Sequence, residues 1–128
     1  ALIDHNKATF KNERLSFNCL DIATDILPEG DCALLRQVLQ HLSNREIASV
    51  VDKLASFKYV ILTEHLPEGD FTPNQDIISG QGTRLKKNSG VQLLMPPFSM
   101  KAVEERELSV TQPTDGKGRI VTTLYTMY

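Results

Sequence analysis

The sequence predicts an α/β fold whose mostly parallel sheet ends in an antiparallel hairpin. Two apolar runs, at 31–36 and 57–63, are short enough for buried strands, and a helical pattern separates them. Near the C-terminus the glycines of Gly116-Lys-Gly118 predict a tight hairpin turn. Strands that alternate with helices favour a parallel sheet, to which the closing hairpin adds an antiparallel edge.

Polar side chains follow both central strands. Arg36, Gln37 and His41 come after the first strand, and Glu64 and His65 come after the second. Ligands of open α/β sheets bind beyond the carboxyl ends of the strands. These five residues are therefore the first candidates for a functional site.

The N-terminal part of the chain predicts a helix, a strand and a turn. Apolar residues recur at helical spacing over 1–13. Residues 15–20 then alternate between apolar and polar, which predicts a strand that ends at Asp21. Pro28 and Gly30 predict the turn that leads into the strand at 31–36.

The rest of the chain predicts a helix, a long loop and two strands. Ser43 or Asn44 caps a helix that runs to about residue 56. The segment 66–97 holds four prolines and four glycines and no sustained period, which predicts a long loop. Its apolar and aromatic residues, with Phe71 and Phe98 expected in the core, favour an ordered excursion. Residues 98–111 are expected to form a short helix and a strand. The β-branched and aromatic residues of 119–128 predict a final strand.

Bulk properties restrict the class of protein. A chain of 128 residues suits one domain, and a net charge of -2 argues against binding nucleic acid through a basic face. No apolar run approaches the roughly 20 residues of a membrane span, and the N-terminus does not resemble a signal peptide. A cytoplasmic protein with no membrane partner is expected. Because the sequence starts at Ala1 and not at Met, we expect it to begin inside a longer chain.

Cysteine and histidine are sparse. Cys19 and Cys32 both fall in predicted strands, where a free thiol packs as a small apolar group, and a disulfide is the alternative. The three histidines lie far apart along the chain, and a zinc site needs closer spacing. We therefore expect no metal site.

The central motifs resemble those of class I S-adenosylmethionine-dependent methyltransferases. The matching residues are Leu20-Asp21-Ile22, Leu27-Pro28-x-Gly30-Asp31, and Leu34-Leu35-Arg36-Gln37-Val38-Leu39-Gln40-His41-Leu42-Ser43. A second set resembles a bacterial subgroup of this class whose members are mostly uncharacterised: Pro73-Asn74-x-Asp76-Ile77, Gly80, Thr83-Arg84 and Pro96-Pro97-Phe98. The resemblance covers nearly the whole chain and implies a partial Rossmann-like sheet.

Two parts of that family's cofactor site are missing from the sequence. The first strand of the family ends in a glycine-rich loop, and the second ends in an acid that binds the ribose. Gly80-Gln-Gly82 is no substitute, because it follows no predicted strand and opens no helix. The resemblance thus implies a single truncated domain, 1–128, with its loop insertion at 66–97. It also implies that the strand at 31–36 has an open apolar edge.

The resemblance assigns cofactor contacts to four residues. Asp21 reaches the adenine amino group and Ile22 packs on the ring, whereas the alternative for Asp21 is a turn-forming role. Arg36 and Gln37 contact the cofactor or line the substrate pocket. Their alternative is a helix start or a surface salt bridge.

The remaining candidates concern the acceptor. His41 is of the residue type that most often acts as a general base, and a packed histidine is the alternative. Glu64 and His65 face the substrate or only anchor the loop. Asn74 and Arg84 lie in the long loop, where Arg84 grips a carboxylate or phosphate of the acceptor or forms a structural salt bridge.

The expected function of the intact protein is methyl transfer from S-adenosylmethionine to a small acceptor. The 128-residue chain itself is expected to bind the cofactor weakly or not at all, without turnover. A non-catalytic scaffold that forms a homodimer through the strand at 31–36 is the alternative. A hydrolase ranks far below both, since no Ser or Cys lies in a glycine-flanked turn between strand and helix.

Overall fold

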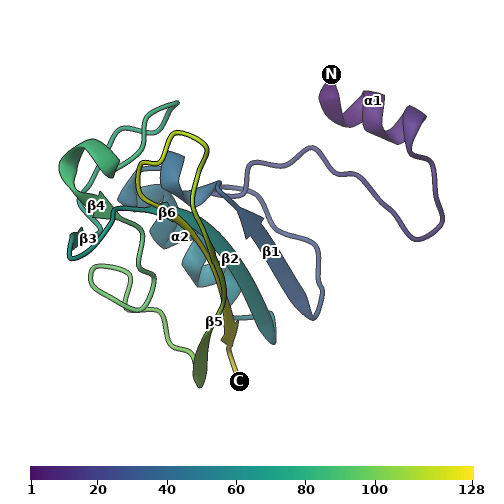
Figure 1. The fold of residues 1–128 in the computed structure, drawn as a ribbon. Helices are drawn as coiled ribbons and strands as arrows, with labels where there is room; N and C mark the ends of the chain where they lie inside the picture. The colour runs from purple at the N-terminus through teal and green to yellow at the C-terminus, as the bar shows by residue number, and fades with distance from the viewer.

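The computed structural model covers residues 1–128 and shows a mixed α/β fold with a detached N-terminal arm, residues 1–20 (Figure 1). The α-helices are α1 (Leu2–Thr9) and α2 (Asn44–Leu54), and the 3-10 turns are η1 (Leu39–His41) and η2 (Leu85–Lys87). The strands are β1 (Cys32–Arg36), β2 (Tyr59–Leu66), β3 (Thr72–Pro73), β4 (Ser89–Gly90), β5 (Glu104–Thr111) and β6 (Arg119–Thr126). Neither α-helix has the length and apolar character needed to cross a bilayer.

The four main strands form one sheet in the order β1-β2-β6-β5. β1 runs parallel to β2, and β6 runs antiparallel to both β2 and β5. The predicted α/β class and C-terminal hairpin are therefore confirmed, with β6 inside the sheet and β5 at its edge. The expectation of a mostly parallel sheet is wrong, because β1–β2 is the one parallel pair of this sheet and the hairpin adds two antiparallel pairs by placing β6 directly beside β2. β3 and β4 form a separate parallel pair within the long loop.

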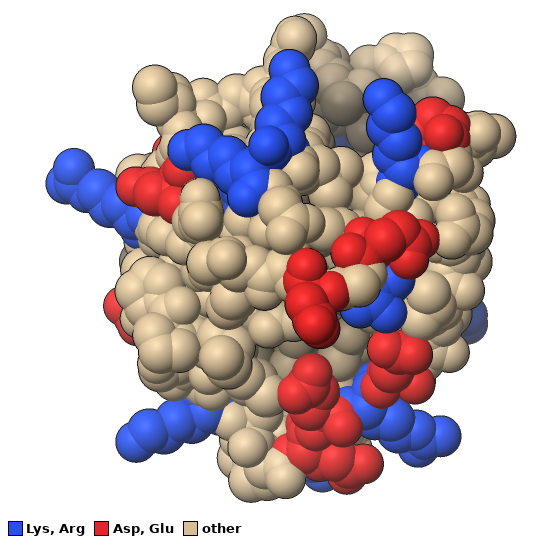
Figure 2. Space-filling view, turned by 60° about the vertical axis from the view of Figure 1, so that its left-hand side comes forward, with Lys and Arg blue, Asp and Glu red and all other residues tan.

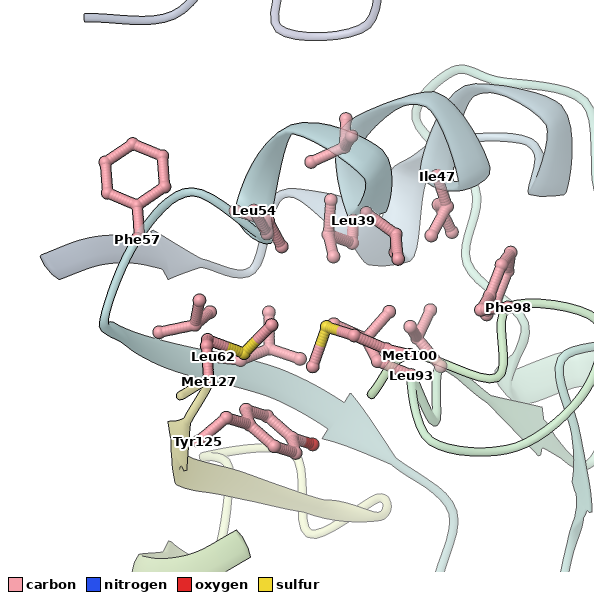
Figure 3. Packing of buried hydrophobic residues seen from close by; sticks show 14 residues of the cluster. Leu39, Ile47, Leu54, Phe57, Leu62, Leu93, Phe98, Met100, Tyr125 and Met127 are labelled. Carbon is pink, nitrogen blue, oxygen red and sulfur yellow. The ribbon is translucent and has the colours of Figure 1, made fainter. Parts of the chain in front are cut away.

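Helix α2 covers one face of the sheet and the core lies between them (Figure 3). The Ser43 side chain accepts a hydrogen bond from the Glu46 backbone N–H, which caps the helix. Its buried residues lie at helical spacing: Ile47, Val50, Val51 and Leu54. The long loop also contributes to the core, because Leu93 and Phe98 are buried in it. Phe98 thus takes its predicted place, while Phe71 is half-buried.

The opposite face of the sheet is partly exposed near β1. Leu34 points to that face and is 74% exposed, next to the half-buried Ile61 and Leu124 on the neighbouring strands. β1 also has no partner on its outer side. The open strand edge expected from the sequence is therefore present, and beside it the opposite face of the sheet exposes Leu34.

The N-terminal arm makes few contacts with the rest of the fold. Helix α1 is shorter than the predicted helix and buries no residue. The predicted strand at 15–20 is wrong, because this segment forms only an isolated bridge, between Leu15 and Asn12. A strand needs a neighbouring strand for its backbone hydrogen bonds, and no strand of either sheet lies beside this segment. Leu15 and Leu20 are accordingly exposed.

Two further expectations are corrected. Residues 98–103 form no helix, because backbone N–H groups there bond elsewhere: Met100 donates to Leu93 and Val103 donates to Thr126. Cys19 and Cys32 are free thiols, as expected, but both are exposed. Cys19 lies in the arm and Cys32 on the uncovered side of β1, so no core surrounds either thiol.

Candidate functional site

Strand β1 ends in a left-handed turn at Gln37. Gln37 has φ 52°, and its backbone N–H donates to the Thr63 carbonyl over 2.8 Å, one residue beyond the paired strand. This turn leads the chain into η1 above the end of the sheet. Arg36, the last strand residue, remains exposed. Arg36 and Gln37 therefore lie at the carboxyl end of the parallel pair, which is where a ligand is expected.

His41 connects η1 to the long loop. Its Nδ1 donates to the Gly82 carbonyl over 3.1 Å, and its own carbonyl accepts from Gly80 over 3.0 Å. With the proton on Nδ1, Nε2 is the basic nitrogen, and it lies 3.5 Å from the Gln40 amide nitrogen. His41 thus anchors the loop, and its role as general base stays a prediction.

Glu64 and His65 lie inside β2 and not beyond its end as predicted, because the pairing of β2 with β6 extends the strand to Leu66. They do not share a site, because successive strand residues point to opposite faces. Glu64 points toward the α2 side and is 3% exposed. His65 points to the other side, where its Nε2 donates to the Lys117 carbonyl over 2.6 Å in the hairpin turn. Its backbone N–H donates to the Gln40 side chain over 2.9 Å. Gln40, a buried residue that the sequence did not single out, therefore links the ends of β1 and β2.

Arg84 holds the long loop against the start of α2. Its guanidinium donates to the carbonyls of Gln75 (2.7 Å), Gln40 (3.3 Å) and Leu42 (2.7 Å), and to Asn44 Oδ1 (2.8 Å). At 2% exposure the side chain is buried. Burial lowers the pKa of Arg84 below its ordinary value, and the charges of Asp76 and Glu64 oppose this. These contacts favour a structural role over a grip on a ligand, which stays a prediction.

Asn74 plays a similar part further along the loop. Its amide donates to the carbonyls of Gln92 (2.8 Å) and Pro96 (2.9 Å), and its Oδ1 accepts from the Gln92 backbone over 2.7 Å. The residue is buried, with φ 59°. Asn74 and Arg84 together explain why a loop of this length is ordered, since both use buried side chains to bind backbone groups.

A cavity of about 350 Å³ lies between the sheet and residues 91–95. Glu64 lines it, together with Arg119, Tyr125, Glu105 and Glu107. Neither Glu64 oxygen has a hydrogen-bond partner. Burial raises the pKa of Glu64 to about 8, against the smaller lowering effects of the Gln40 backbone N–H, the Arg84 charge and the Leu39 backbone N–H. These two N–H groups lie near the carboxyl group without the geometry of a full hydrogen bond. Glu64 is thus largely protonated at pH 7.

Four of these cavity residues were not predicted from the sequence. Arg119 lies on the same sheet face as Val121 and Tyr125, and its buried Nε has no partner. Burial, with Glu105 and Glu64 adding, raises the pKa of Tyr125 above its ordinary range, so its hydroxyl stays protonated. The period-two alternation of 119–126 marks this face, but it does not show which loop closes over it.

Asp21 and Ile22 lie apart from this cavity, beside the open edge of β1. Asp21 Oδ1 accepts from the Ala23 backbone over 2.9 Å, which makes a local turn, and the residue is exposed. Ile22 lines an apolar groove of about 320 Å³ along β1 and α2. Lys53 Nζ fixes this segment by donating to the Ile22 and Asp25 carbonyls over 2.8 and 2.7 Å.

The residues present supply only part of a site for S-adenosylmethionine. Asp21, with one carboxylate oxygen that makes no intramolecular hydrogen bond, and the apolar Ile22 suit the adenine end. No glycine-rich turn follows either parallel strand, so nothing here matches the family's loop for the methionine end. No group of three or more His, Cys, Asp or Glu side chains gathers to hold a metal ion.

Comparison with known proteins identifies no relative of this chain. No protein-family model, curated protein or solved structure matches it.

Proposed function

We propose that the chain is the C-terminal part of a class I S-adenosylmethionine-dependent methyltransferase domain, with a partial Rossmann-like sheet. The intact protein would transfer a methyl group to a small acceptor. The motif resemblance over 20–43 motivates the proposal. The parallel pair β1–β2 with α2 between its strands, followed by an antiparallel hairpin, supports it.

The observation that carries the proposal is that β1 is an edge strand with exposed apolar surface beside it. The outer edge of β1 is unpaired, Leu34 is exposed, and the apolar groove at Ile22 runs beside it. A hydrophobic edge strand is a liability unless another segment covers it. A further parallel strand on this edge would satisfy the backbone of β1, and a helix packed over Leu34 would bury it.

The proposed roles follow the positions of the residues. Asp21 and Ile22 hold the adenine, while Arg36 and Gln37 border the cofactor or the acceptor. S-adenosylmethionine supplies an electrophilic methyl group when bound. The chain's own residues then need to align the acceptor and exclude water, with His41 able to take a proton where the acceptor carries one.

Calorimetric titration tests this proposal. A longer protein that includes the residues encoded before Ala1 should bind S-adenosylmethionine and its demethylated product, and the 128-residue chain should bind both at least about 100-fold more weakly. Asp21→Asn should weaken binding about tenfold, the usual effect of losing a charge-assisted hydrogen bond. Asp31→Asn, a change at an exposed acid before β1, is the matched control.

The proposal fails if the longer protein binds neither compound, or if the gene upstream of Ala1 encodes no strand followed by a glycine-rich turn.

A non-catalytic scaffold that self-associates through β1 is the second candidate, and the same open edge favours it. Leu34→Lys separates the two. A scaffold dimer should dissociate in sedimentation experiments on this variant while its monomer stays folded, because Leu34 is already exposed. In the methyltransferase, the longer protein should instead lose stability, since the lysine would be buried under the added helices.

A further inference from the structure

The cavity beside Glu64 has the dimensions of a small-molecule site. At about 350 Å³ it falls within the usual range for ligand pockets, and more than half of its lining residues are apolar. All of its walls come from this chain: β2, β5, β6 and residues 91–95. Binding there does not require the missing part of the proposed methyltransferase.

Glu64 is the feature that points to a ligand. The residue is 3% exposed, and the backbone N–H groups of Gln40 and Leu39 near its carboxyl group lower its pKa only slightly against burial. Neither of them meets either oxygen with the geometry of a full hydrogen bond. Buried polar groups in folded proteins nearly always have partners, and leaving one unpaired costs about 1–3 kcal/mol. The fold retains this carboxyl group at the wall of a cavity, where a ligand can supply the missing donor.

The other polar groups of the cavity define what kind of ligand fits. Glu105 and Glu107 add two carboxylates from β5 against the single positive charge of Arg119, so the lining favours a cation. Figure 2 shows one side of the molecule on which acidic side chains gather over the central and lower parts, with basic side chains between and beside them. Arg119 Nε is a buried donor without a partner. It lies two residues from the position that pairs with Glu64 on β6.

We propose that this cavity binds a small organic amine. The ammonium group donates to Glu64, an oxygen elsewhere in the molecule accepts from Arg119 Nε, and the apolar walls cover the carbon frame. This inference goes beyond methyl transfer and does not rest on it.

Binding of such an amine is coupled to proton release. Burial raises the pKa of Glu64 to about 8. The charged and titratable groups around it are Arg84, Tyr125, Arg119, Glu105 and Glu107. An ammonium ion prefers the carboxylate form, so Glu64 loses its proton on binding at pH 7. The affinity should therefore rise about tenfold per pH unit below pH 8.

Titration calorimetry of the 128-residue chain with tyramine tests the proposal, without any cofactor. Tyrosol, which replaces the amine by a hydroxyl, and 4-hydroxyphenylacetate, which replaces it by a carboxylate, are the matched probes. Tyramine should bind at least tenfold more tightly than either at pH 8, and about 50-fold more tightly at pH 8 than at pH 6. The carbon-13 shift of the Glu64 carboxyl group should show its pKa falling as tyramine is added.

Variants locate the binding. Glu64→Gln should remove the preference for tyramine over tyrosol and flatten the pH dependence, while circular dichroism reports whether the variant folds. Glu68→Gln changes an exposed acid outside the cavity and should leave both unchanged. Equal affinity for the three probes, no detectable binding of tyramine at millimolar concentration, or full affinity in a folded Glu64→Gln variant would each overturn the proposal.

Discussion

Replacing Glu64 by glutamine should change how the stability of the fold depends on pH. Glu64 is buried without a hydrogen bond of full geometry, and its pKa rises from 4.5, the ordinary value, to about 8 in the folded protein. The folded state therefore holds a proton on this residue that the unfolded state has already released above pH 4.5. Glutamine has a similar shape and no proton to lose.

The magnitude follows from this difference of about 3.5 pH units. Each unit corresponds to about 1.4 kcal/mol, so the wild-type protein should lose about 5 kcal/mol of unfolding free energy between pH 4.5 and 8 through Glu64 alone. The stability that the neutral acid allows is fully present below pH 4.5 and is lost as the pH rises to 8. The Glu64→Gln variant lacks this loss, so its advantage over wild type should grow with pH.

Urea unfolding at pH 5, 6, 7 and 8 measures the effect. The difference in unfolding free energy between variant and wild type should increase by about 1.4 kcal/mol per unit until it levels off near pH 8. Glu104→Gln, which changes an exposed acid on β5, is the control and should follow the wild type. Parallel stability curves for Glu64→Gln and wild type over this range would refute the reasoning.

Two further predictions concern the loop and the hairpin. Arg84→Met leaves three carbonyls and the Asn44 side chain without their donor. The variant should therefore lose about 3 kcal/mol or more of unfolding free energy in urea unfolding, and Arg84→Lys should not restore it because a lysine lacks the planar guanidinium. An unchanged unfolding midpoint for either variant would contradict this. Gly118 has φ 68°, and a Cβ added there would collide with the Leu66 carbonyl and lie 2.9 Å from His65 Nε2. Gly118→Ala should therefore lower the free energy of unfolding by about 2 kcal/mol or more, as measured by thermal unfolding. Gly116→Ala, at φ 70° with open space around it, should cost only about 1 kcal/mol, and equal losses for the two variants would show that the close approach to β2 does not matter.

The centre of the fold was predictable because its signals are local. The apolar runs that became β1 and β2, the Ser43 cap and the helical spacing of α2 all lie within short windows of sequence. The glycine turn between β5 and β6 is also local. In contrast, residues 15–20 carry a strand pattern and form no strand, since pairing requires a neighbour that the pattern cannot supply.

The candidate site was less predictable, because it depends on contacts between distant segments. Sequence position put Glu64 and His65 together, while the alternation of β2 sends them to opposite faces. Arg84 is of a residue type that often binds anions, but its guanidinium donates to carbonyls up to 44 residues away in the sequence. The charged residues and the tyrosine that line the cavity with Glu64 come from β5 and β6, more than 40 residues further along the chain.

The long connection between β2 and β6 has a consequence for the order of folding. Thr63 pairs with Thr122, and their hydroxyl groups lie 2.9 Å apart across a separation of 59 residues. Closing so long a loop costs entropy before any strand contact rewards it, so β1, α2 and β2 should assemble first and the hairpin should dock later. During synthesis β2 would wait with its second edge free until β6 emerges. That interval, more than the finished fold, is when the chain is most exposed to mispairing with other strands.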